Sequence, residues 1–159
     1  MTESVSVRPM RPGEEVDVCA LVARVFNEHI APEFPQEGIE EFFRYARPEG
    51  MAQRSRAGET ILLAQEANRL VGMLEMRGID HIALLFVETQ GRGIGRQLVD
   101  HAFRICRERA PGVRRVSVHA SRYAVPIYRR LGFESEGPEQ TLNGITFLPM
   151  VFRFGRECP

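Results

Sequence analysis

The hydrophobic positions of the chain change their period several times, and each change marks the boundary of a predicted element. Val5 and Val7 alternate with polar residues, as expected of a short strand. Apolar residues then recur at helical spacing over residues 16–27 and 39–46, with a proline-rich irregular stretch between the two runs and a break at Pro48. The first third of the chain therefore predicts one strand followed by two helices.

The middle of the chain predicts three strands and a long helix. Residues 60–66 and 70–77 have the composition of strands, and the short polar segment 67–69 between them suits a hairpin turn. Residues 81–87 form an almost continuous apolar run, which is typical of a central strand buried on both faces. Apolar residues spaced by four from Ile94 onward predict an amphipathic helix of about 15 residues.

The last third predicts a strand, a short helix and a terminal strand pair. Residues 116–120 alternate like a strand, and residues 124–131 form a short helix with a proline near its start and a glycine after its end. Residues 133–136 and 145–154 complete a strand pair, the second bulged or at a sheet edge because of Pro149. The order βααβββαβαββ predicts an α/β fold with a mixed sheet flanked by helices.

Composition agrees with one globular domain spanning residues 1–159, since 43% of the residues are hydrophobic and 26% are charged. No apolar run approaches the ~20 residues of a membrane span, and the N-terminal segment lacks the apolar core of a secretory signal. The three cysteines have no metal-binding spacing, so neither a disulfide framework nor a metal site is expected. We therefore expect a soluble protein of a reducing cytoplasm, with no metal and no membrane partner.

The formal net charge of zero conceals a strong segregation of charge along the chain. Residues 1–91 carry 9 arginines and 15 acids, whereas residues 92–130 carry 10 arginines and 2 acids. The neutral total is therefore a cancellation between an acidic and a basic part of the chain. The chain contains no lysine, which excludes the lysine-dependent phosphate loop of nucleotide hydrolases and Schiff-base chemistry.

The glycine-rich segment before the long helix predicts a site for a pyrophosphate. It follows a buried strand, and a helix N-terminus offers unpaired N–H groups to an anion, which glycines allow to approach closely. A dinucleotide fingerprint would need glycine where the chain has Arg96 or Leu98, so the ligand is not a dinucleotide of that class. The segment reads Gln90-Gly91-Arg92-Gly93-Ile94-Gly95-Arg96.

Two correctly spaced motifs resemble those of the GNAT superfamily of acyl-CoA N-acyltransferases. The glycine segment is similar to the family's Q/R-x-x-G-x-G/A signature, and residues 124–133 are similar to its A-x-x-x-Y-x-x-L-G-F helix. With the strand order, the resemblance covers nearly the whole chain. It implies a mostly antiparallel sheet with a cleft between the fourth and fifth strands, and acetyl-CoA as the co-substrate.

The resemblance also implies roles for individual residues. Tyr128 would protonate or hydrogen-bond the departing thiolate, and strand backbone would hold the pantetheine arm. Relatives often carry Asn at position 119, where this chain has His119, and Ser121 could substitute for that contact. The residues expected to contact acetyl-CoA are Leu85, Phe86, Val87, Gln90, Gly91, Arg92, Gly93, Ile94, Gly95, Arg96, His119 and Ser121.

The attacking amine must lose a proton, and three residues are candidates for the base. Glu75 ranks first by analogy with family members that use an acid from this part of the sheet, although it would need burial to raise its pKa. His81 and His119 have a suitable unperturbed pKa. The sequence leaves the choice open, together with a base that acts through water.

The amine acceptor is expected to lie between the first two helices and the last strand pair, around residues 29–34, Tyr45 and 136–146. We predict an acetyl-CoA-dependent N-acetyltransferase that transfers acetyl to a small-molecule or peptide amine by direct attack in a ternary complex. The alternatives are a non-catalytic acyl-CoA-binding or regulatory domain and a nucleic-acid module, which lacks the aromatics it would need. The edge-like last strand favours a homodimer. Acids that would favour a cationic amine are Glu28, Glu33, Glu37, Glu40 and Glu41.

Overall fold

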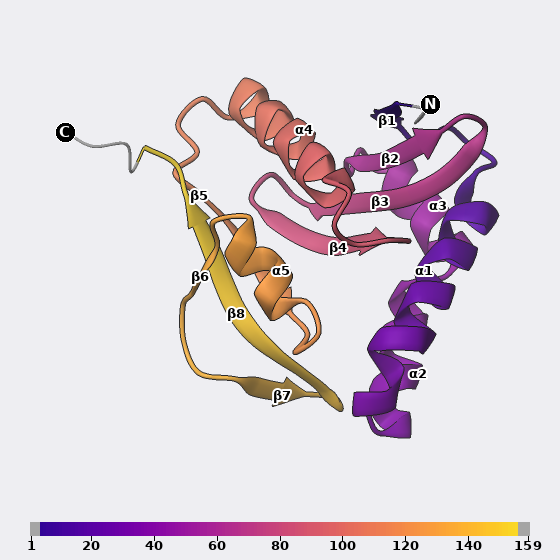
Figure 1. Cartoon of the computed structure of the whole chain (residues 1–159), viewed down its shortest axis with the longest axis vertical. Helices are drawn as coiled ribbons and strands as arrows, with labels where there is room; N and C mark the ends of the chain where they lie inside the picture. The colour runs from indigo at the N-terminus through magenta and orange to yellow at the C-terminus, as the bar shows by residue number, and fades with distance from the viewer. Residues whose placement is uncertain (1–3, 156–159) are drawn as a thin grey trace.

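An eight-stranded sheet runs through the molecule in the order β1-β2-β3-β4-β5-β8-β6, with β7 paired to β8 (Figure 1). The computed structural model describes residues 4–155. All neighbouring strands are antiparallel except β4 and β5, which are parallel. The strands are β1 (Val5–Pro9), β2 (Ile61–Glu66), β3 (Arg69–Arg77), β4 (His81–Val87), β5 (Arg115–Ala120), β6 (Glu134–Ser135), β7 (Gln140–Leu142) and β8 (Ile145–Arg153). The helices are α1 (Glu15–His29), α2 (Gln36–Tyr45), α3 (Pro48–Arg56), α4 (Ile94–Arg109) and α5 (Val125–Arg130), with a 3-10 turn at Ala31–Glu33.

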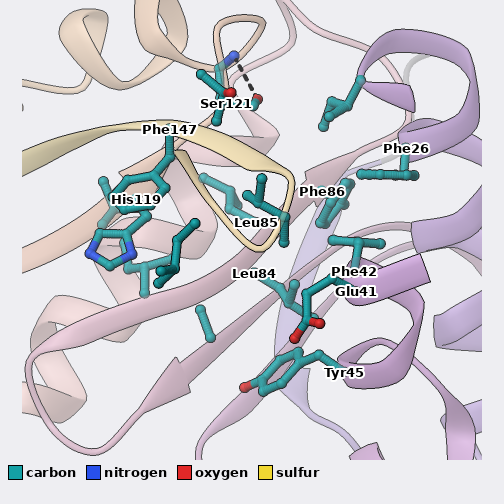
Figure 2. Close-up of a pocket in the computed structure, with 18 of the residues that line it drawn as sticks. Phe26, Glu41, Phe42, Tyr45, Leu84, Leu85, Phe86, His119, Ser121 and Phe147 are labelled. Carbon is teal, nitrogen blue, oxygen red and sulfur yellow. Dashed lines mark hydrogen bonds between the residues drawn. The ribbon is translucent and has the colours of Figure 1, made fainter. Parts of the chain in front are cut away.

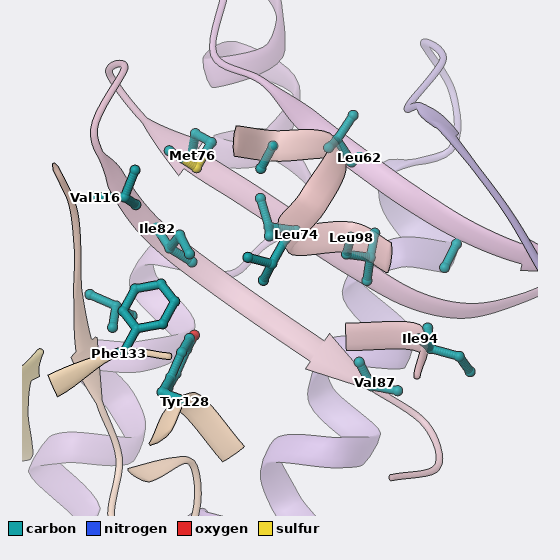
Figure 3. Packing of buried hydrophobic residues seen from close by; sticks show 14 of the residues in the cluster. Leu62, Leu74, Met76, Ile82, Val87, Ile94, Leu98, Val116, Tyr128 and Phe133 are labelled. Carbon is teal, nitrogen blue, oxygen red and sulfur yellow. The ribbon is translucent and has the colours of Figure 1, made fainter. Parts of the chain in front are cut away.

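Helices cover both faces of the sheet, and the period of two in the strands divides their side chains between two cores. Leu62 and Leu74 pack in one core with Leu98 of α4 (Figure 3). Leu63 and Met73, which neighbour them along the strands, pack in the other core with α1 and α3. The predicted mixed, mostly antiparallel sheet flanked by helices is confirmed.

Gly72 explains how closely α4 lies on the sheet. A Cβ at this position would lie 3.2 Å from side-chain atoms of Ile94 and Leu98 and 3.3 Å from the carbonyl oxygen of Phe86. The glycine therefore lets the first turns of α4 rest directly on β3, beside the end of β4. This contact fixes the glycine-rich turn, which joins β4 to α4, against the sheet.

Helix α3 was not predicted, because Pro48 and Gly50 suggested a break. Pro48 instead occupies the first turn of the helix, where the missing N–H costs nothing and the fixed φ suits the start. Met51 is the one buried residue of this helix. It is fully buried and packs against α1 and the sheet. One buried residue in nine gives no periodic signal, so the amphipathic pattern could not reveal the helix.

The prediction that Pro149 lies in a bulged or edge strand is wrong. β8 is an interior strand, paired to β5 on one side and to β6 and β7 on the other, without a register shift against β5. The carbonyl of Pro149 accepts from Glu136, so the ring nitrogen faces the same side, where β6 pairs only residues 150–151 and β7 only residues 145–147. The N–H group that Pro149 lacks would thus have faced the gap between the short strands β6 and β7. The edge-strand reason for a homodimer disappears with it.

The hairpin of β7 and β8 closes against the start of α2. Asn143 and Gly144 at its tip both have positive φ, 53° and 81°, as the tight turn of a twisted hairpin requires. A Cβ at Gly38 of α2 would collide with the carbonyl of Gly144, and the reverse substitution would strike the backbone of Gly38. The two backbones therefore touch without intervening side chains. An Asn-Gly pair is typical of a hairpin turn, so Asn143 and Gly144 are a sequence signal for β7.

Two of the three cysteines lie in the part of the chain that the structure describes. Cys19 and Cys106 are buried free thiols, and Cys158 lies outside the described residues. Burial raises the pKa of Cys19 to about 11, so its thiol stays protonated and unreactive at neutral pH. Within residues 4–155, every helix is too short or too polar to cross a bilayer.

Candidate active site

The sheet opens between β4 and β5. Their parallel ladder joins only residues 81–82 to residues 117–118. Further along β4, the amide of Glu88 donates to β3, so by alternation the N–H and C=O groups of Leu85 and Val87 face the opposite edge, toward β5. That edge carries no β5 partner there. The predicted cleft between the fourth and fifth strands is confirmed.

A cavity of about 410 Å³ occupies the opening and extends to α1, α2 and the β7–β8 hairpin (Figure 2). Among the residues predicted to contact acetyl-CoA, Leu85, Phe86, His119 and Ser121 line the cavity, and so does Tyr128. Val87, the glycine segment 90–96 and Glu75 do not line it. The hydroxyl of Ser121 accepts from the amide of Ala124 at 3.2 Å, at the start of α5.

The glycine-rich turn presents unpaired amides at the start of α4. Gly91 and Gly93 have φ of 85° and 76°, and a Cβ on either would meet nothing within 4 Å, so backbone conformation rather than crowding requires glycine there. Gly93 is the N-cap and no side chain caps the helix. The first amide to find a helical acceptor is that of Gln97, which donates to Gly93 at 3.1 Å. The amides of 94–96 are therefore available to an anion.

The two arginines of this turn are held by protein groups. The guanidinium of Arg92 pairs with Glu66 of β2, and Nη2 of Arg96 donates to the carbonyl of Arg130 at 2.9 Å. The second contact ties the start of α4 to the end of α5, which places the two sequence motifs side by side. Backbone amides are thus the groups of this turn that are free to bind an anion.

Tyr128 lies between the two strands that separate, in the core beneath α4. Its ring is 4% exposed and meets the ring of Phe133 edge-on at 5.2 Å (Figure 3). Its hydroxyl forms no hydrogen bond within residues 4–155, and because no enclosed polar side-chain atom there lacks a partner, the hydroxyl must be open to the cavity. Burial raises the pKa of Tyr128, so the phenol stays protonated and acts as a donor.

Two histidines and an arginine meet on the face of the sheet that α1 and α2 cover. His119 is the first residue of β5 beyond its last pair with β4, and its ring stacks on Phe147 at 4.2 Å (Figure 2). The ring of His81 meets it edge-on at 4.9 Å, and Nδ1 of His81 lies 2.8 Å from the hydroxyl of Ser117. Arg77 pairs with His81 in the β3–β4 ladder. All three charged or titratable side chains line the cavity.

Both histidines are neutral at physiological pH. Burial, then the neighbouring His119, then Arg77 lower the pKa of His81 to about 4. Burial and the charge of Arg77 also lower the pKa of His119 below its usual range. A neutral imidazole at the point where the strands separate can accept a proton.

Glu75 sits elsewhere, fully buried under the cavity, and its two partners are half-buried. Its carboxylate accepts from Nε of Arg54 at 2.5 Å and from the hydroxyl of Tyr45 at 2.9 Å, and Arg54 lies over the Tyr45 ring at 3.7 Å. Only Tyr45 of the three lines the cavity. Glu75 therefore links Tyr45 of α2 to Arg54 of α3 through three hydrogen bonds. Sequence reasoning missed Arg54, because no local pattern marks it.

The end of the cavity away from Tyr128 is aromatic. The rings of Phe26 and Phe42 stack at 3.9 Å, and Phe34 meets Phe26 edge-on at 5.8 Å. Of the five acids expected to favour a cationic amine, only Glu41 lines the cavity, and it is paired with Arg44. Within residues 4–155, no group of three His, Cys, Asp or Glu side chains is placed to hold a metal ion.

Several solved structures share the fold across nearly their whole length. A GCN5-related N-acetyltransferase from Rhodopseudomonas palustris is 22% identical with a TM-score of 0.78, and covers 97% of this chain and 98% of its own. PaiA N-acetyltransferase from Thermoplasma acidophilum, solved with coenzyme A, is 18% identical with a TM-score of 0.78, over 95% and 99% of the two chains. Ribosomal-protein-S5-alanine acetyltransferase from Vibrio fischeri is 19% identical with a TM-score of 0.66, over 100% and 98%.

A family model settles the relationship that these structures indicate. Among curated protein sequences no significant match is found. The model of the acetyltransferase (GNAT) domain, however, matches residues 30–154, which include both motifs, the opening between β4 and β5 and every cavity-lining residue except Phe26. This chain therefore belongs to the GNAT acetyltransferase family.

Proposed function

We propose that the protein is an acetyl-CoA-dependent N-acetyltransferase that acts on a primary amine in a ternary complex. The opening between β4 and β5 carries the proposal, because it brings a neutral histidine and a protonated tyrosine to one cavity. The amine nitrogen would attack the thioester carbonyl carbon, so that a C–N bond forms, the C–S bond breaks, and the amine loses the proton that the thiolate finally receives.

The residues present fit acetyl-CoA. The uncapped amides of 94–96 would bind the pyrophosphate, and the free backbone edge at Leu85 and Val87 would hydrogen-bond the pantetheine arm. Gly91 and Gly93 leave the turn open to an approaching phosphate, with nothing within 4 Å of their Cβ positions. Acetyl-CoA supplies the activated acetyl group, and the protein orients it.

His119 is the base that this geometry favours. It lies at the point where the strands separate, lines the cavity and is neutral, whereas Glu75 is enclosed by Arg54 and Tyr45. His81 is also neutral, but one of its ring nitrogens is occupied by Ser117. We assign proton acceptance to His119, directly or through one water.

Turnover of acetyl-CoA across a panel of amines, with thiol release as the readout, tests the proposed function. The expected result is thiol release that depends on the added amine, with one acetylamine formed per thiol. A protein that binds CoA in calorimetry yet releases no thiol with any amine would be the non-catalytic acyl-CoA-binding domain. Absence of CoA binding by the folded protein would overturn both functions.

The Gly93→Val substitution should weaken CoA binding by about tenfold or more, because a β-branched residue resists the left-handed conformation that the N-cap adopts. Calorimetric titration with CoA measures the change. Gly58→Val is the matched control, since Gly58 has φ of 99° with open space around its Cβ position and lies outside the site. The Gly58→Val variant should lose a similar free energy of unfolding and keep the CoA affinity of the wild type. Equal affinity of the Gly93 variant and the wild type would remove the turn from the binding site.

The His119→Asn substitution should lower kcat/KM by about 10²-fold and change its pH dependence. In the wild type, kcat/KM should fall as the pH drops through the lowered pKa of His119, because protonation removes the base. The variant should lack that acidic limb while CoA affinity is kept. An acidic limb that persists in the variant would assign the proton transfer to another group.

A further inference from the structure

Two charged side chains line the cavity, and they are not equivalent. Glu41 is neutralised by its ion pair with Arg44, and Figure 2 shows it beside Tyr45. Arg77 makes no ion pair with any residue in 4–155, and its nearest recorded partner is the Tyr45 ring, 5.3 Å from the guanidinium carbon. The uncompensated charge on the cavity wall is therefore positive.

Arg77 stands next to the proposed base. It pairs with His81 across the β3–β4 ladder, and the rings of His81 and His119 are 4.9 Å apart. Partners in an antiparallel ladder project from the same face, so Arg77, His81 and His119 share the face that borders the cavity. An anionic group bound to Arg77 would lie close to an amine bound at His119.

The rest of the cavity wall is an unfavourable environment for a second positive charge, because it is apolar. Phe26, Phe34, Phe42 and Ile30 line the end that α1 and α2 form. Burying an unpaired ammonium against these side chains is strongly unfavourable, as for any unpaired charge in an apolar setting. This end suits an apolar substituent, and it disfavours a polyamine.

We propose that the acceptor is a free α-amino acid with an apolar or aromatic side chain, whose carboxylate binds Arg77 while its side chain occupies the phenylalanine-lined end. This substrate class rests on the proposed acetyltransferase function. Arg77 can hold a carboxylate through two parallel N–H bonds, which a single point charge cannot do. The same positive charge, together with the apolar walls, favours the neutral form of the amine, which is the form that attacks.

The experiment compares phenylalanine with phenethylamine, which differ only in the carboxylate, and adds spermidine as a cationic acceptor. With the wild type, kcat/KM for phenylalanine should exceed that for phenethylamine by about tenfold or more. Arg77→Gln should remove this preference by raising KM for phenylalanine. Arg104→Gln, on α4 across the sheet, is the matched control and should leave kcat/KM unchanged for both substrates.

Binding provides a readout that does not need turnover. Calorimetric titration of phenylalanine and phenethylamine into the CoA-saturated protein should show the same preference and the same loss in Arg77→Gln. Binding that depends on Arg77 without acetylation would overturn the enzyme function and keep the amino-acid site. Acetylation of phenethylamine or spermidine as efficient as that of phenylalanine, or sensitive to Glu41→Gln and not to Arg77→Gln, would overturn the amino-acid site and keep the enzyme.

Discussion

Arg54→Met is expected to lower the free energy of unfolding by about 3–5 kcal/mol, because it leaves the carboxylate of Glu75 buried without its counter-ion. Glu75 is 0% exposed, and Arg54 and Tyr45 supply the hydrogen bonds recorded to its side chain. The remaining tyrosine hydroxyl cannot balance a full charge. Urea unfolding monitored by circular dichroism measures the loss.

Two comparisons separate the buried charge from other effects of the change. Arg122→Met removes the exposed ion pair with Glu139, 2.7 Å long at the surface, and should leave the free energy of unfolding nearly unchanged. The double variant Arg54→Met with Glu75→Met should recover much of the loss, since apolar side chains can fill the space of a buried pair. A double variant as unstable as the single one would mean that the packing of Arg54, rather than its charge, holds α3 in place.

The elements that the sequence predicted are those whose signal is local. The apolar run of β4 and the spacing of four in α4 each arise from one segment burying its own face, and both elements lie where they were expected. The glycine turn and the segment around Tyr128 also carry their information within a few residues. These segments lie beside the opening of the sheet, but the cleft itself was expected only through the family resemblance that their motifs carry.

What could not be predicted depends on contacts between distant segments. Glu75 ranked first among the candidate bases by family analogy alone, and the sequence could not reveal its partner Arg54, which is 21 residues away on a helix without an amphipathic pattern. The charge of Arg77 at the cavity is likewise visible only when β3 and β4 are paired. A carboxylate inside a strand can be a base or half of an ion pair, and only the fold decides.

The segregation of charge along the chain has a different meaning in three dimensions. Arginines of the basic segment pair with acids from other segments, as Arg92 does with Glu66 and Arg122 with Glu139. Such pairs cancel part of the sequence asymmetry at the surface of the molecule. The acids of the first half do not gather at the cavity, so the expected cationic acceptor loses its main support, and the unpaired Arg77 points to the opposite charge.

Tyr128→Phe is expected to lower kcat by about 10²-fold while CoA affinity stays within about twofold of the wild type, since one donor to a developing anion is worth about that much. The raised pKa of Tyr128 makes the phenol a weaker acid than a thiol, which favours a hydrogen bond to the leaving thiolate over complete proton transfer. The interaction strengthens only as the C–S bond breaks, so it affects kcat rather than binding. Steady-state kinetics with thiol detection and calorimetry with CoA measure the two quantities.

Tyr123→Phe is the matched control for this variant. Tyr123 stacks on His29 at 4.6 Å, close to the cavity in the fold but outside its lining, so loss of its hydroxyl should leave kcat unchanged. The Tyr128 variant should keep the wild-type melting temperature, because its hydroxyl has no partner among residues 4–155 whose bond would be lost. An unchanged kcat in a stable Tyr128→Phe protein would mean that the thiolate departs without help from this side chain, and that solvent entering the opening between β4 and β5 supplies the proton.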